Sequence, residues 1–85
     1  MRQLNQIIDQ VNFRRSLFNK PNIDLSVAAD REFMADELNC MMSPENVAMD
    51  GECSPAEANR RWAFYEKAAR QLLSIDSSLE LYELY

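Results

Sequence analysis

The chain has 85 residues, of which 47% are hydrophobic and 27% charged, and its net charge at pH 7 is −5. A chain of this length forms one domain at most. These fractions of hydrophobic and charged residues are those of ordinary globular proteins and argue against disorder. It contains one glycine, two cysteines and no histidine, which excludes glycine-rich phosphate loops, disulfide-rich scaffolds and histidine-based catalysis. We therefore expect one all-α domain over residues 1–85 that is not an enzyme and needs no cofactor.

The first helix is predicted over residues 2–18. Leu4, Ile7, Val11 and Phe18 recur at three- and four-residue spacing or its multiples and form one apolar stripe. Pro21 disfavours helical backbone at the residue before it, so the helix should end before this proline.

A second helix is predicted over residues 25–42, with its start capped by Asp24 or Ser26. Val27, Met34 and Leu38 lie on its apolar side. Much of the remaining surface is acidic, and the candidate partner-binding residues there are Asp30, Glu32, Asp36 and Glu37. These carboxylates either pair with basic neighbouring helices or present a negative face to a basic partner.

The third helix, over residues 55–74, has the clearest start in the chain. Ser54 is its expected cap, Pro55 occupies the first helical position, and Glu57 completes a capping box. Trp62 and Tyr65 fall on the apolar stripe. The opposite side carries three basic residues, which are the candidates for contact with nucleic acid: Arg60, Lys67 and Arg70.

Residues 77–85 fit two patterns. Ser77 and Glu80 resemble a capping box, which favours a short helix, whereas the alternation of Leu79 and Leu81 is typical of a strand. The expected architecture is a bundle of three main helices plus a short C-terminal helix. The tail either folds back on the core or docks on a partner or a second copy. The candidate contact residues for docking are Leu81, Tyr82 and Tyr85.

Residues 46–57 resemble an EF-hand calcium loop, with Asn46, Asp50, Gly51 and Glu57 at matching positions. The third position is Ala48, which offers no side-chain oxygen. We therefore expect a connection between helices here, and no metal site.

Two features bear on location. No segment approaches the ~20 apolar residues of a membrane span, and polar residues interrupt the start of the chain where a signal peptide would be apolar. Cys40 and Cys53 are expected to stay reduced. We expect a cytoplasmic protein without a membrane partner, in the host cytoplasm if it is viral.

The favoured hypothesis is a small non-catalytic protein-interaction module that presents its acidic helical face to a larger protein or complex. Small acidic helical proteins of this kind are common among phage-encoded inhibitors, and this analogy of fold suggests an inhibitor or adaptor. One alternative is an assembly protein that forms a homo-oligomer through its tail. Another is a nucleic-acid-binding regulator that uses the third helix, which the acidic net charge disfavours.

Overall fold

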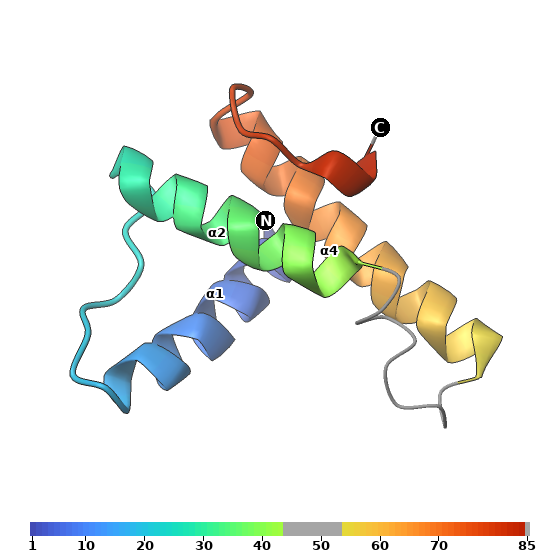
Figure 1. Cartoon of the computed structure of the whole chain (residues 1–85), viewed down its shortest axis with the longest axis horizontal. Coiled ribbons are helices and arrows are strands. Elements are labelled where there is room, and N and C mark those ends of the chain that lie inside the picture. The colour runs from blue at the N-terminus through green and yellow to red at the C-terminus, as the bar shows by residue number, and fades with distance from the viewer. Residues whose placement is uncertain (44–53, 85) are drawn as a thin grey trace.

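The computed structural model describes residues 1–43 and 54–84, and over them it is a compact globule of three α-helices without strands (Figure 1). The helices are α1 (Arg2–Ser16), α2 (Ala28–Met42) and α4 (Pro55–Ile75). The predicted all-α class with three main helices is confirmed. In place of the predicted short C-terminal helix there is one 3-10 turn, η1 (Tyr82–Leu84). The calcium-like pattern up to Cys53, and Tyr85, lie outside the described residues.

The long helix α4 is the centre of the fold, because both α1 and α2 pack against it (Figure 1). Ala68 and Ala69 are fully buried on α4, and their small side chains let the other two helices approach closely. The larger core residues come from the three α-helices and from the segment that follows α4: Leu4, Ile7, Val11, Met34, Leu38, Met42, Leu72, Leu79 and Leu81. Full burial of such a side chain stabilises the fold by roughly 1.5–3 kcal/mol.

Helix α1 ends two residues earlier than predicted. Asn19 adopts a left-handed conformation with φ of 57°, and the backbone N–H of Lys20 donates to the carbonyl of Arg15 at 3.0 Å. The N–H of Asn19 donates to the carbonyl of Ser16, which completes a Schellman motif. Phe18 therefore lies beyond the helix and is 74% exposed, so its predicted place on the apolar stripe was wrong.

Helix α2 begins three residues later than predicted. The side chain and backbone N–H of Ser26 both donate to the carboxylate of Asp24, which holds these residues in a turn. Val27 is the residue preceding the helix and is exposed, so the prediction that it faces the core was wrong. The guanidinium of Arg31 donates to the carbonyl of Leu25 and to the carboxylate of Asp76, which connects this turn to the end of α4.

The start of α4 follows the predicted capping pattern. The hydroxyl of Ser54 accepts a hydrogen bond from the backbone N–H of Glu57 at 3.2 Å, and Pro55 occupies the first position of the helix. The helix continues to Ile75, one residue beyond the predicted end. None of the helices in the described part of the chain is long and apolar enough to cross a membrane.

Beyond α4 the chain folds back along α2 (Figure 1). Leu79 and Leu81 insert into the core, whereas Glu80 and Tyr82 between and after them are exposed. Buried and exposed residues thus alternate as the sequence pattern predicted, although the described residues of this segment form no strand. Asn39 on α2 holds this segment by donating a hydrogen bond to the carbonyl of Glu80 and accepting one from the backbone N–H of Tyr82.

Candidate functional site

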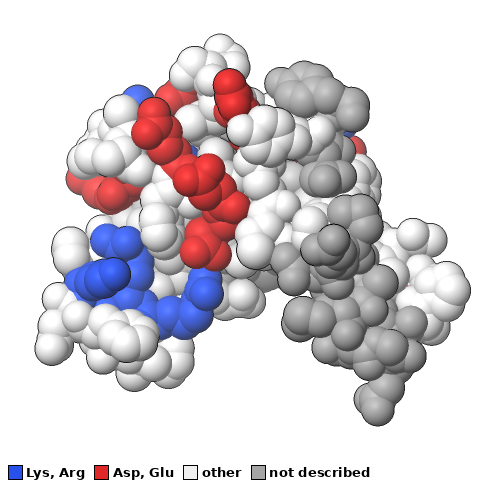
Figure 2. Space-filling view, in the orientation of Figure 1, with Lys and Arg blue, Asp and Glu red and all other residues white. Residues whose placement is uncertain are grey.

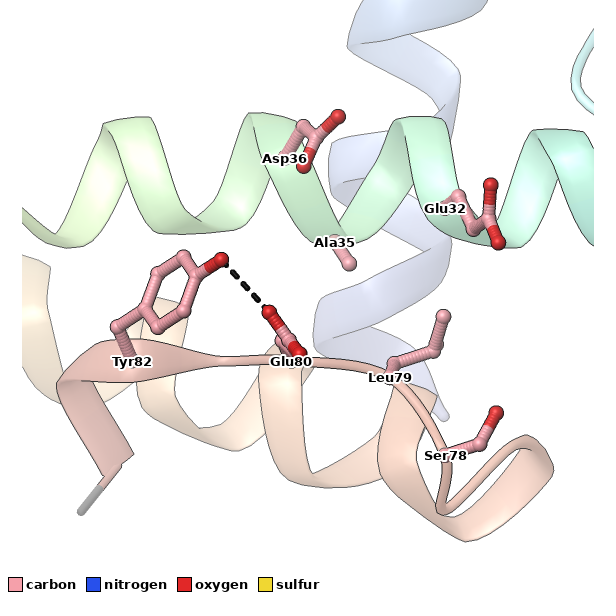
Figure 3. Close-up of a pocket in the computed structure, with 7 residues that line it drawn as sticks. All are labelled: Glu32, Ala35, Asp36, Ser78, Leu79, Glu80 and Tyr82. Atoms are coloured by element: carbon pink, nitrogen blue, oxygen red, sulfur yellow. Dashed lines mark hydrogen bonds between the residues drawn. The ribbon is translucent and has the colours of Figure 1, made fainter.

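A groove of about 280 Å³ lies between α2 and the C-terminal segment, residues 76–84, which follows α4 (Figure 3). Helix α2 contributes Glu32 and Asp36, which are one helical turn apart, and the C-terminal segment contributes Glu80 and Tyr82. The segment is anchored on both sides of Glu80, because the neighbouring residues Leu79 and Leu81 are buried in the core. The groove therefore brings three carboxylates and one phenol together on a fixed framework.

Tyr82 is the aromatic member of this groove. Its hydroxyl donates a hydrogen bond to Oε2 of Glu80 at 2.8 Å, as Figure 3 shows. This hydrogen bond and the negative charge of Glu80 raise the pKa of Tyr82, with a smaller contribution from the charge of Asp36. The phenol remains protonated at neutral pH, and the side chain is 65% exposed. It offers an aromatic surface beside negative charge.

The four acidic residues predicted on α2 divide into two pairs with different surroundings. Glu32 and Asp36 are exposed in the groove, and their side chains make no hydrogen bond or ion pair with another described residue. Asp30 instead accepts a hydrogen bond from the backbone N–H of Asp24 at 2.8 Å. Glu37 pairs with Arg14 of α1 at 3.2 Å. The acidic side chains cover α2 in Figure 2, but Asp30 and Glu37 have structural partners.

The residues predicted for a docking tail also divide. Leu81 has no exposed surface, so it belongs to the core and cannot contact a partner in this structure. Tyr82 lies at the surface, as a contact residue would. Glu80 lines the groove but was not among the predicted site residues. The alternation noted in the sequence could have identified it, because burial of Leu79 and Leu81 forces Glu80 outward.

The basic residues predicted on α4 are at the surface. Arg60 and Lys67 are exposed, and Nε of Arg70 pairs with Glu66 of the preceding turn at 3.0 Å. Trp62 and Tyr65 are partly buried and pack against the core. These two aromatic rings are therefore engaged in the fold, which limits the stacking surface that a nucleic acid would require.

A second groove, of about 260 Å³, lies at the end of α1 and was missed by the sequence reasoning. Its walls include Val11 and Phe18 from the α1 side and Phe33 from α2. Arg14, Arg15 and Lys20 provide positive charge at its edges. The available signal was the adjacency of these cations to Phe13, Leu17 and Phe18 in the sequence.

Arg15 is held in place within this second groove. Its guanidinium carbon lies 5.2 Å from the centroid of the Phe33 ring, and its Nε donates to the carbonyl of Pro21 at 2.7 Å. The first contact is a cation–π interaction, and the second fixes the direction of the guanidinium. The positive charge of Arg15 is thereby held over the apolar ring of Phe33.

Among the described residues there is no group of three or more histidine, cysteine or acidic side chains arranged to hold a metal ion. Comparison of the chain with protein families, with curated proteins and with solved structures finds no match. The two grooves and their charges are the features of the described surface that bear on function.

Proposed function

We propose that this chain is a small non-catalytic protein-interaction module whose groove between α2 and the C-terminal segment binds a basic segment of a larger protein. The observation that carries this proposal is that Glu32, Asp36 and Glu80 line one groove together with the exposed Tyr82. Neither Glu32 nor Asp36 has a cationic partner among the described residues, so their charge is available to an approaching ligand.

The chemistry of the groove favours arginine or lysine side chains. Carboxylates attract them electrostatically, and the exposed face of a tyrosine ring adds a cation–π contact of about 0.5–1 kcal/mol. The groove is also pre-organised, because Asn39 binds the backbone on both sides of Leu81. A fixed site loses less conformational entropy when it binds a ligand.

The role that fits this surface is that of an inhibitor or adaptor, acting in the cytoplasm by occupying a basic surface on its target. Surfaces of that kind include those that contact nucleic-acid phosphates, whose charge Glu32 and Asp36 would partly imitate. The analogy with phage-encoded inhibitors supports this proposal at the level of fold only.

A fluorescence-anisotropy titration with a labelled oligo-arginine peptide tests the proposal. At low salt, Asp36→Asn should weaken binding by about five- to tenfold, as expected for loss of one close charge contact. Asp9→Asn is the matched control, because Asp9 is an exposed carboxylate of α1 outside the groove. Equal weakening by both substitutions would show that the peptide responds to net charge alone, and the proposed groove would be rejected.

A further inference from the structure

The surface around the second groove exposes an unusual amount of apolar side chain. Phe13, Leu17 and Phe18 are 67%, 66% and 74% exposed, although all three are large and hydrophobic. Phe13 lies in the last turn of α1, and Leu17 and Phe18 directly follow the helix. Of the three, Phe18 lines the groove. Large apolar side chains exposed close together at one end of a helix are typical of interaction sites.

The charge of this surface opposes that of the chain as a whole. Arg14, Arg15 and Lys20 line the groove, and Glu37 is the one acidic residue among its lining side chains. The side-chain ammonium of Lys20 makes no hydrogen bond or ion pair with another described residue, although its backbone N–H donates to Arg15. We call the surface formed by Phe13, Arg14, Arg15, Leu17, Phe18 and Lys20 the basic–apolar patch. Its positive charge favours an acidic occupant.

This same chain carries a surface of the required charge. The groove between α2 and the C-terminal segment presents Glu32, Asp36 and Glu80 together with the exposed ring of Tyr82. Figure 2 shows the two charges on one face of the molecule, with acidic side chains over α2 and basic ones directly beside them over the end of α1.

Two adjacent patches of opposite charge on one face make that face self-complementary. A two-fold axis lying in the plane of the face, between the patches, places the acidic groove of each copy against the basic–apolar patch of the other. Both contacts form at once, and each covers exposed apolar surface. A single contact between unlike patches would leave one of each uncovered.

We propose that a second copy of this chain occupies the basic–apolar patch, in a two-fold symmetric dimer stabilised by reciprocal contacts with the acidic groove. The dimer uses the groove that the proposed function assigns to a basic partner, so partner binding and dimerisation compete. The inference does not rest on that function, because it concerns the purified chain alone.

Sedimentation velocity over a concentration series, at low and high salt, measures the dimer directly. The dissociation constant should rise by at least about tenfold at high salt, because mobile ions screen exposed charges beyond the Debye length. A wild-type chain that stays monomeric at every concentration at low salt overturns the proposal.

Charge reversal then tests the reciprocal geometry. Two double variants should each abolish the homodimer: Arg14→Glu/Lys20→Glu and Glu32→Lys/Asp36→Lys. In each of them the groove of one copy meets a patch of the same charge on the other. A mixture of the two variants should form a heterodimer, because both contacts are again complementary. Failure of the mixture to associate overturns the two-fold arrangement. Lys20→Glu alone is the substitute if loss of the Arg14–Glu37 pair impairs folding, which circular dichroism detects.

The matched control is Arg60→Glu/Lys67→Glu, which makes the same change in net charge on exposed residues of α4. Dimerisation of this control should equal that of the wild type, and loss of its dimer would overturn the assigned surface. The oligo-arginine titration separates the two proposals. Peptide binding by a monomeric wild-type chain rejects the dimer alone, whereas a dimer that the peptide neither binds nor dissociates rejects the proposed function alone.

Discussion

The side-chain oxygen of Asn39 accepts a hydrogen bond from the backbone N–H of Tyr82 at 3.0 Å. The amide nitrogen of the same side chain donates to the carbonyl of Glu80 at 2.9 Å. One α2 residue thus supplies the two hydrogen bonds that a neighbouring strand would offer, and it does so on either side of the buried Leu81. The geometry of the acidic groove therefore depends on a residue that is not among those lining it.

Replacing Asn39 should affect both stability and binding. Asn39→Ala removes both hydrogen bonds and should lower the free energy of unfolding by about 1–3 kcal/mol. Urea denaturation followed by circular dichroism measures this change. Asn39→Asp keeps the acceptor for Tyr82 but loses the donor to Glu80, so it should fall between Asn39→Ala and the wild type. A stability equal to that of the wild type in both variants would contradict the anchoring role.

Leu81 and Tyr82 are adjacent but should respond very differently to truncation. Leu81→Ala creates a cavity in the core and should cost about 2–5 kcal/mol. Tyr82→Ala removes an exposed side chain and should change the free energy of unfolding by roughly 0.5 kcal/mol or less. The same substitution should weaken binding of the oligo-arginine peptide. Urea denaturation of both variants checks the contrast. Comparable losses of stability would mean that the segment is not packed as the structure shows.

Asp76 should make the fold sensitive to acid. Hydrogen bonds from the Ser78 side chain, from Arg31 and from the Ser78 backbone hold the pKa of Asp76 at about 2, below its ordinary value of 3.8. Because the folded-state pKa is lowered, the stabilisation is present above pH 3.8 and is lost as the pH falls toward 2. Denaturation midpoints measured across this interval should fall less steeply in Asp76→Asn than in the wild type. Parallel pH profiles would contradict the assignment.

The pKa of Tyr82 provides a direct report on the groove. Its hydrogen bond to Glu80 raises that pKa above 10.0, so Glu80→Gln, which removes the charge, should lower it. The ultraviolet absorbance of tyrosinate measures the titration, and Tyr82→Phe identifies the contribution of this residue. Asp9→Asn should leave the curve unchanged. An unaltered titration in Glu80→Gln would show that the two side chains do not interact in solution.

Local patterns were sufficient to predict much of the fold. The spacing of Leu4, Ile7 and Val11 gave the buried face of α1, and Ser54 with Pro55 gave the start of α4. Phe18 was misplaced because the left-handed conformation of Asn19 ends the helical repeat earlier than Pro21 alone requires. The spacing of apolar residues does not reveal where a backbone hydrogen-bond motif ends the helix.

The candidate site was predictable only in part, because its composition depends on tertiary neighbours. All four predicted acidic residues are aspartate or glutamate on α2. Asp30 and Glu37 differ from the other two only because Asp24 and Arg14 lie close enough to bond them. Tyr82 was identified from its apolar surroundings. That Glu80 lines the same groove as the α2 carboxylates could not be predicted without knowing the path of the chain after α4.

Helix α1 begins without a side-chain cap of its own and without an acidic residue in its first turn. The backbone N–H of Leu4 instead donates to Oε1 of Gln71 at 2.9 Å, and Nε2 of Gln71 donates to Oε1 of Gln3 at 2.7 Å. An isolated helix of 15 residues is marginally stable in water, and here a residue 67 positions away supplies a hydrogen bond to its first turn. The opening and closing parts of this chain should therefore gain and lose their amide-exchange protection together, as one cooperative unit.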